Sequence, residues 1–241
     1  MSGWFALLGS GEFQPWSSEV DAWMLDRVTG DGRVLVTPTA SAPEGDEMFE
    51  QWATRGLQHF AGDSVPAELL EVRDRTDAGD AGFVEQLTTA SVVYFSGGNP
   101  AYLARTLNGS SLWKAVLAGL DRGMGYIGCS AGMASLGRKA PDSTVDELSP
   151  ALWADGLRLF PHTWFGPHWD RLDHYAPGLT AHFDATVPPD DLLVGVDEQT
   201  AIVGDGEHWQ VVGVGDAHVR ETGTWRHLKT GERFVVDLLG P

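Results

Sequence analysis

Four short apolar runs near the start of the chain are separated by segments with helical spacing, and this alternation narrows the choice of fold most. The runs are Trp4–Leu8, Arg33–Thr37, Glu68–Val72 and Val92–Phe95. Between the second and third runs, apolar residues recur every three to five positions from Met48 to Phe60, mostly on one helix face. Strands that alternate with helices form βαβ units, in which a mainly parallel sheet is covered on both faces. The pattern therefore predicts an α/β fold of three layers, with the sheet between two layers of helices.

The chain changes character from Leu192 onward. Short apolar runs follow one another there and are punctuated by Gly204–Gly206 and Gly213–Gly215. These runs are Leu192–Val196, Thr200–Val203, Trp209–Val214, Ala217–Val219 and Phe234–Leu238. Such spacing is typical of hairpins, so we expect an antiparallel extension at one edge of the sheet. Because no stretch has the composition of a linker, we expect residues 1–241 to form a single domain.

Composition and charge exclude several classes of function. The net charge of −18 argues against a nucleic-acid partner, because nucleic-acid binding depends on a basic footprint. A single cysteine, Cys129, excludes an internal disulfide framework and a multi-cysteine metal site. No apolar run reaches the ~18 residues that a membrane helix needs, and no basic residue precedes Trp4–Leu8 as in a signal peptide. We expect a cytoplasmic monomer or homodimer that binds no membrane.

A five-residue motif, Gly128-Cys129-Ser130-Ala131-Gly132, fits the pattern of a nucleophile elbow. The glycines are needed because side chains two residues either side of the nucleophile would collide across a sharp strand-to-helix turn. A helix that starts at Ala131 also points its first amides at the site, where they stabilise an oxyanion. The motif makes Ser130 the candidate nucleophile and Cys129 a small buried residue. The alternative interpretation is a glycine-rich turn with a capping serine.

Further segments of the chain extend this motif to a family pattern. They are Val92–Asn99, which ends in Gly-Gly-Asn, then Gly156–Pro161, Pro167–Trp169 and Gly195–Ala201. In this order and spacing they resemble the S51 serine peptidases, the family of aspartyl dipeptidase and cyanophycinase. The resemblance runs from about Leu7 to Phe234. It implies a flavodoxin-like fold of the class I glutamine amidotransferase type, with serine in place of the cysteine nucleophile.

The resemblance also implies roles for particular residues. Ser130 would be the nucleophile, His168 the general base and Glu198 the acid that orients the base, while Gly98 and Ala131 would supply amides to the oxyanion hole. The chemistry agrees, since serine attacks only when a neighbouring base takes its proton and imidazole titrates near neutral pH. A carboxylate on the far ring nitrogen fixes the tautomer of the base. The resemblance therefore predicts a Ser-His-Glu triad that acts through an acyl-enzyme.

The acid is the least constrained member of this triad. Asp197 precedes Glu198, and alternation along a strand would send the two side chains to opposite faces. Asp142 and Asp146, in the loop after the elbow helix, are further alternatives.

Two cofactor sites, one for a metal and one for a dinucleotide, fit the sequence less well than the triad does. The cluster of His162, His168, Asp170, Asp173 and His174 could suggest a metal site, but the Gly166-Pro167 break separates its first member from the others. Gly9-Ser10-Gly11 follows a strand as in a dinucleotide loop, yet glutamine stands where the third glycine is required. We expect neither a metal nor an organic cofactor.

The expected substrate is a short peptide with an N-terminal aspartate, as the resemblance to aspartyl dipeptidase implies. The alternatives are a cyanophycinase-like hydrolase of β-Asp-Arg and a non-catalytic small-molecule-binding protein with the same fold. In a protein this acidic, an anionic substrate needs local cations. The expected substrate-binding residues are Arg171 first, then His162 and Asn99, with Arg138 and Lys139 as further cations. Trp164 and Trp169 flank the base and are expected to line the pocket.

Overall fold

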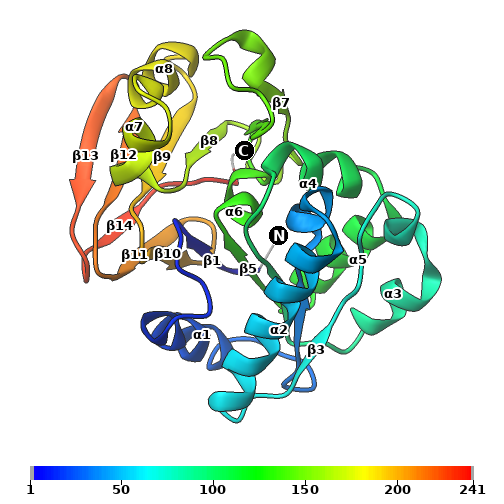
Figure 1. Cartoon of the computed structure of the whole chain (residues 1–241). Helices are drawn as coiled ribbons and strands as arrows, with labels where there is room; N and C mark the ends of the chain where they lie inside the picture. Colours follow the sequence, from blue (N-terminus) through cyan, green and yellow to red (C-terminus); the bar gives the residue numbers. More distant parts are fainter. Residues whose placement is uncertain (1–2, 240–241) are drawn as a thin grey trace.

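The computed structural model describes residues 3–239, and a sheet of eight strands forms its centre (Figure 1). The strands lie in the order β14-β11-β10-β1-β5-β4-β2-β3. Their bounds are β1 Trp4–Leu8, β2 Val34–Thr37, β3 Ala67–Leu69, β4 Val92–Phe95, β5 Gly125–Cys129, β10 Thr200–Gly204, β11 His208–Gly213 and β14 Arg233–Val235. Strands β1 to β5 run parallel, and β10, β11 and β14 extend the β1 side in antiparallel pairs. The mainly parallel sheet with an antiparallel extension is confirmed.

Helices cover both faces of this sheet. On one face lie α1 (Ser18–Leu25) and α2 (Asp46–Gly62), and on the other α3 (Ala81–Gln86), α4 (Pro100–Leu107), α5 (Ser111–Asp121) and α6 (Ala131–Ala134). The strand β1 shows why: Phe5 and Leu7 pack with the second group, whereas Ala6 and Leu8 pack against the first. Successive strand residues point to opposite faces, so a strand that is apolar throughout must be covered twice. The three-layer arrangement is thus confirmed.

The C-terminal strands are divided between two sheets, which the sequence did not predict. A second sheet, in the order β13-β12-β9-β8, contains β8 (Thr163–Gly166), β9 (Leu192–Val196), β12 (Ala217–Glu221) and β13 (Thr224–Leu228). It lies on the left in Figure 1 together with α7 (Leu172–Tyr175) and α8 (Leu179–Thr186). Runs with the same apolar pattern can pair with either sheet, so pattern alone does not select the partner strand.

Smaller elements complete the fold. A two-stranded sheet joins β6 (Lys139–Pro141) to β7 (Trp153–Asp155). The short 3₁₀ helices are η1 Pro15–Ser17, η2 Thr39–Glu44, η3 Asp77–Gly79, η4 Pro150–Leu152 and η5 Trp169–Arg171. Among residues 3–239, no helix has the length and apolar character needed to cross a membrane.

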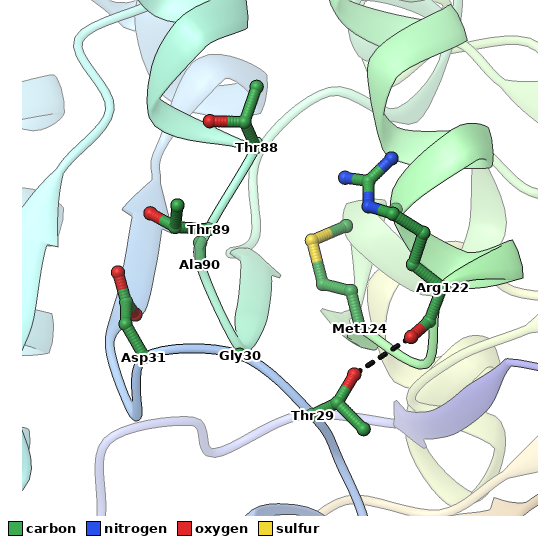
Figure 2. Close-up of a pocket in the computed structure, with 9 residues that line it drawn as sticks. Thr29, Gly30, Asp31, Thr88, Thr89, Ala90, Arg122 and Met124 are labelled. Carbon is green, nitrogen blue, oxygen red and sulfur yellow. Dashed lines mark hydrogen bonds between the residues drawn. The ribbon is translucent and has the colours of Figure 1, made fainter.

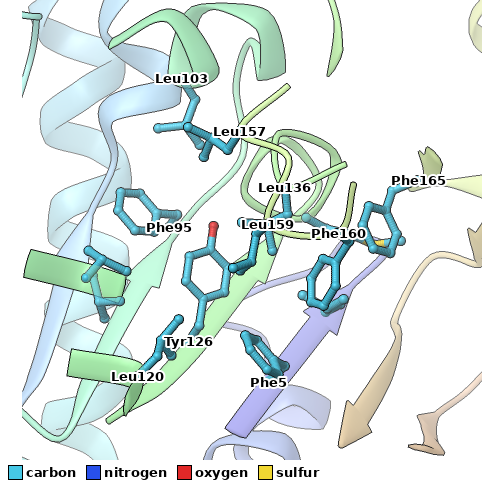
Figure 3. Packing of buried hydrophobic residues seen from close by; sticks show 14 of the residues in the cluster. Phe5, Phe95, Leu103, Leu120, Tyr126, Leu136, Leu157, Leu159, Phe160 and Phe165 are labelled. Atoms are coloured by element: carbon cyan, nitrogen blue, oxygen red, sulfur yellow. The ribbon is translucent and has the colours of Figure 1, made fainter. Parts of the chain in front are cut away.

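The core beneath the carboxyl edge of the sheet is aromatic. Figure 3 shows Tyr126 of β5 close to Phe95 of β4, and their rings stack with centroids 5.5 Å apart. The Tyr126 hydroxyl donates a 2.7 Å hydrogen bond to the carbonyl oxygen of Gly132 in α6. This contact fixes the short helix against the two central strands that end at the candidate site.

Candidate active site

The elbow around Ser130 is a strained turn between β5 and α6. Ser130 has φ 49° and ψ −102°, a conformation that non-glycine residues adopt only where the surroundings impose it. A Cβ atom added to Gly128 would lie 2.6 Å from the carbonyl group of Gly132, and one added to Gly132 would overlap the carbonyl oxygen of Phe95. The two glycines are therefore required by close backbone approach, as the motif predicts.

A chain of hydrogen bonds joins Ser130, His168 and Glu198. The Nε2 atom of His168 lies 3.0 Å from Ser130 Oγ, and its Nδ1 atom lies 2.9 Å from Glu198 Oε1. With the proton on Nδ1 donated to the carboxylate, Nε2 is left to accept the serine hydroxyl proton. The structure thus brings the three residues into the relationship that the resemblance implies.

The pairing of β8 with β9 explains how the last two side chains meet. The strands are parallel neighbours, with Gly166 opposite Gly195, so their carboxyl ends lie at the same edge. His168 follows the first strand and Glu198 follows the second. His168 adopts a left-handed conformation, with φ 53° and ψ 36°, which turns its ring away from the path of the strand.

Glu198 is held as a carboxylate by several donors. Burial raises its pKa, but hydrogen bonds from His168 and from the Tyr175 hydroxyl, at 2.9 and 3.0 Å, outweigh burial and leave the pKa below its ordinary value. Arg171 adds a positive charge, with Nε 3.8 Å from Oε2. Asp170 accepts the Glu198 backbone N–H at 2.8 Å and fixes the loop. An ionised Glu198 stabilises a positive charge on the imidazole.

The other candidate acids have different neighbours. Asp197 points the opposite way, as alternation predicts, and binds the Nε2 atom of His218 at 2.9 Å. Asp142 accepts hydrogen bonds from Asn99 and Arg105, at 2.9 and 3.0 Å. Asp146 lines a cavity beside the site. Within the described residues, Glu198 is the carboxylate among these four in contact with the ring of His168.

The amides expected to form an oxyanion hole flank Ser130. Gly98 follows β4 with φ +137°, and a Cβ there would lie within 2.5 Å of the Ser41 amide nitrogen, so only glycine fits. Ala131 begins the elbow helix, where the first amides have no intrahelical acceptor. In the part of the chain that the structure describes, neither amide donates to another residue of the protein.

Two cavities meet at Ser130, and each includes Gly98 and His168 in its wall. The first, here called the polar cavity, has a volume of about 520 Å³ and also contains Glu12, Trp52 and Arg55. The second, here called the apolar cavity, has a volume of about 460 Å³. Its additional lining is mainly aliphatic, with Leu148, Leu152, Leu172, Leu179, Val145 and Phe183. Ser130, the candidate nucleophile, therefore lies between two compartments of different chemistry.

The residues predicted to bind substrate have other partners. Arg171 lies near Glu198, His162 lies 3.6 Å from Asp191, and neither lines the two cavities. The Asn99 side chain accepts the Tyr102 amide and donates to a carboxylate, so it caps α4 instead of facing a cavity. The two further cations are also paired, Arg138 with Asp191 at 2.9 Å and Lys139 with Asp155 at 3.0 Å.

The tryptophans beside the base do not line the cavities, contrary to the prediction from sequence. The ring of Trp169 lies over Gly166 and Gly195, whose missing side chains leave room for it. Trp164 is buried in the cluster beneath α7 and α8. His168 contacts Ser130 and Glu198, whereas the next residue, Trp169, packs on the two glycines. Trp52 in α2 is half-buried and lines the polar cavity.

The sequence placed the loop Gly9–Glu12 near the active site but assigned no role to Glu12, and it did not identify Arg55. Glu12 is buried and accepts hydrogen bonds from the Gly97 amide at 2.8 Å and from the Cys129 thiol at 3.0 Å. Burial and the neighbouring Glu12 raise the pKa of the Cys129 thiol well above its usual value, so the residue stays a protonated thiol. Trp52 and Arg55 are three residues apart on α2, so they share a helix face. This spacing was the sequence feature that could have paired the two residues.

A third cavity lies at the other end of the parallel strands (Figure 2). Thr29 precedes β2, Ala90 precedes β4 and Met124 precedes β5, so this cavity of about 400 Å³ faces the amino ends of the strands. Sites in parallel α/β sheets form at the carboxyl ends of the strands, and Ser130 follows the carboxyl end of β5. The cavity in Figure 2 is therefore not part of the candidate site.

Comparison with known proteins assigns the chain to a family. The model of peptidase family S51 matches residues 5–212. The chain belongs to peptidase family S51. It is a serine-type peptidase, as the family and its relatives indicate.

Individual relatives of this S51 peptidase cover most of its length. A cyanophycinase from Geminocystis herdmanii is 27% identical over 218 residues, which are 87% of this chain and 76% of that protein. A cyanophycinase from Nostoc sp. is 25% identical over 79% of this chain and 64% of its own length. The crystal structure of a peptidase from an acI-B1 actinobacterium is similar over 98% of both chains, with 31% identity and a TM-score of 0.89. A putative peptidase E protein from Listeria monocytogenes EGD-e shares the fold, with 18% identity and a TM-score of 0.64 over 89% of this chain and 100% of its own.

Proposed function

We propose that this S51 peptidase is a dipeptidase that hydrolyses short peptides with an N-terminal aspartate, using Ser130, His168 and Glu198 as a catalytic triad. The observation that carries the proposal is the continuous hydrogen-bond chain from Ser130 Oγ through the His168 ring to Glu198 Oε1. Serine becomes a nucleophile when a base in hydrogen-bond contact takes its proton, and the ionised carboxylate keeps the base in the required tautomer.

The proposed reaction has two halves. His168 Nε2 takes the hydroxyl proton while Ser130 Oγ bonds to the carbonyl carbon of the scissile peptide. The resulting oxyanion is stabilised by the amides of Gly98 and Ala131. His168 then gives the proton to the leaving amine, the C–N bond breaks and an acyl-enzyme remains. A water molecule, deprotonated by the same imidazole, then attacks the ester carbon. The bond from that carbon to Ser130 Oγ breaks, His168 returns the proton to Oγ, and the acid product leaves.

We place the two residues of a dipeptide substrate in the two cavities. The base donates its proton to the leaving amine, and the apolar cavity includes Pro167, Leu172 and Tyr175 from the segment that carries the base. We therefore place the leaving residue in the apolar cavity, where a side chain such as leucine buries apolar surface. The residue on the acyl side then occupies the polar cavity.

A cyanophycinase-like activity on β-Asp-Arg is the second candidate, because the curated relatives that match are cyanophycinases. A leaving arginine would have to enter the apolar cavity, whose lining includes one carboxylate, Asp146. We expect Asp-Leu to be hydrolysed faster than β-Asp-Arg. Faster release of arginine from β-Asp-Arg would favour the second candidate.

The test of the nucleophile compares Ser130→Ala with Cys129→Ala. We expect Ser130→Ala to abolish hydrolysis of Asp-Leu and labelling by a fluorophosphonate probe, because the attacking oxygen is missing. Cys129→Ala should keep most activity, since the thiol is buried and protonated. Circular dichroism controls for folding in both variants. Full labelling of Ser130→Ala, or inactivation of the wild type by a thiol reagent that Cys129→Ala resists, would show that Ser130 is not the nucleophile.

A further inference from the structure

Arg55 is the one lysine or arginine among the residues that line the polar and apolar cavities. It lies on α2, and the polar cavity that it lines also contains Ser130 and His168. Across residues 3–239, the structure gives Arg55 no carboxylate within ion-pair distance, whereas Arg171, Arg138 and Lys139 each have one. Among the described residues, the cavity at Ser130 therefore contains a cation that has no carboxylate in ion-pair contact.

The position of Arg55 is supported by an aromatic ring. Its guanidinium carbon lies 5.1 Å from the ring centroid of Trp52, one helical turn earlier on α2. Stacking on a ring holds the plane of the guanidinium but uses none of its N–H groups. Those N–H groups remain able to donate two parallel hydrogen bonds to a carboxylate.

The polar cavity also contains the buried carboxylate of Glu12. One carboxylate and one guanidinium in the same cavity complement a group that carries an ammonium and a carboxylate together. An N-terminal aspartyl residue carries both, its α-ammonium and its side-chain carboxylate. In a chain of net charge −18, a local cation is also what allows an anionic group to enter.

We propose that Arg55 binds the side-chain carboxylate of the substrate residue on the acyl side of the cleaved bond, and so makes the enzyme selective for an acidic N-terminal residue. This inference rests on the proposed function, which places the acyl residue in the polar cavity. It replaces Arg171, whose guanidinium lies beside Glu198, as the residue that selects the substrate.

The test measures kcat/KM of Arg55→Met for three substrates, Asp-Leu, Asn-Leu and Asp-Leu amide. Loss of a charge-assisted bidentate contact should lower kcat/KM for both aspartyl substrates by roughly 10- to 100-fold, with less than about a twofold change for Asn-Leu. The matched control is Arg27→Met, because Arg27 also lies over a tryptophan, 4.2 Å from the ring centroid of Trp23, but outside both cavities. It should leave all three rates unchanged.

Two outcomes of this experiment overturn the inference. An equal loss for Asp-Leu and Asn-Leu would show that Arg55 does not read the side-chain charge. A loss for Asp-Leu that the amide escapes would assign the contact to the C-terminal carboxylate of the substrate.

A binding measurement separates this inference from the proposed function. Calorimetry compares L-aspartate and L-asparagine binding to Ser130→Ala and to Ser130→Ala with Arg55→Met added. The inference is supported if adding Arg55→Met to Ser130→Ala weakens aspartate binding at least about tenfold, and if Arg55→Lys in the same background weakens it less. This result supports the inference even if the wild type hydrolyses none of the peptides. Such inactivity would refute the proposed function alone. Equal aspartate binding with and without the guanidinium, or no aspartate binding at all, overturns the assignment of Arg55.

Discussion

Replacing Gly132 by alanine tests whether backbone contact at the elbow both stabilises the fold and positions the nucleophile. A Cβ on Gly132 would overlap the carbonyl oxygen of Phe95 and lie 3.0 Å from its carbonyl carbon and from its Cβ. Two of these three atoms belong to the backbone of β4, so the overlap cannot be relieved by rotating a side chain. Either α6 or the end of β4 has to move.

The expected cost follows from this overlap. Overpacking a rigid core position lowers the free energy of unfolding by about 1–3 kcal/mol, and this lowers Tm by about 2–12 °C in a chain of this size. Phe95 leads directly into the segment that contains Gly98, so the same displacement changes the position of that amide relative to Ser130. A misplacement of this kind can reduce kcat by up to about 100-fold.

Gly62 provides the matched control. It is the last residue of α2, and no atom of residues 3–239 lies within 4 Å of a Cβ added there. Alanine at this position should raise the free energy of unfolding by up to about 1 kcal/mol and leave kcat unchanged, because alanine favours helix more than glycine does. Thermal unfolding and steady-state hydrolysis of Asp-Leu are measured on both variants. An unchanged Tm and kcat for Gly132→Ala would refute the steric argument, and an equal loss in Gly62→Ala would show that the effect is not specific to the elbow.

Two further predictions concern charge and proton transfer. His168→Ala and Glu198→Gln should each lower kcat/KM by about 10²–10⁴-fold. His168→Ala should be the more severe, because it removes the proton acceptor itself. Near-normal turnover of Glu198→Gln would exclude that carboxylate from the reaction. Asp142→Asn should destabilise the fold by about 1–3 kcal/mol at pH 7. Burial raises the Asp142 pKa, but hydrogen bonds from Asn99, Thr144 and Arg105 hold it far below its usual value. The ionised carboxylate therefore stabilises the folded state above about pH 4, and this contribution is lost as the pH falls toward the pKa of the folded state. Urea unfolding at several pH values checks this, and a stability difference between wild type and variant that is as large at about pH 2 as at pH 7 would contradict it.

Local sequence was sufficient to predict the strands and the glycines that surround Ser130. The bounds of β1 and β4 match the predicted runs Trp4–Leu8 and Val92–Phe95, because both strands are apolar on both faces and end at turn residues. The steric argument for Gly128 and Gly132 needed only the five-residue motif and the geometry of a sharp turn. Asp197 and Glu198 contact different partners, as expected from their adjacency, although both lie in the turn after β9 and not in a strand.

The substrate-binding residues could not be found in the same way. Arg171 is three residues from the base in sequence, and this proximity made it the first candidate, yet its guanidinium lies beside Glu198 and outside both cavities. Arg55 is distant in sequence from the elbow and reaches the polar cavity because α2 packs over the face of the sheet that carries Leu8 and Cys129. That placement depends on long-range packing, which local pattern does not encode.

The distance between Ser130 and His168 depends on how the two sheets pack. Ser130 follows a strand of the eight-stranded sheet, whereas His168 and Glu198 follow neighbouring strands of the four-stranded sheet. One apolar cluster spans both sheets, with Phe5 on β1 against Phe160, and Phe160 in turn against Phe165 on β8, at ring-centroid distances of 5.3 and 5.5 Å. Because interiors are close-packed, this contact transmits small shifts of either sheet to the 3.0 Å separation of Nε2 and Oγ. The hydrogen bond that carries the proposed chemistry is thus a property of the whole core, and substitutions far from Ser130 can change turnover without altering any reacting group.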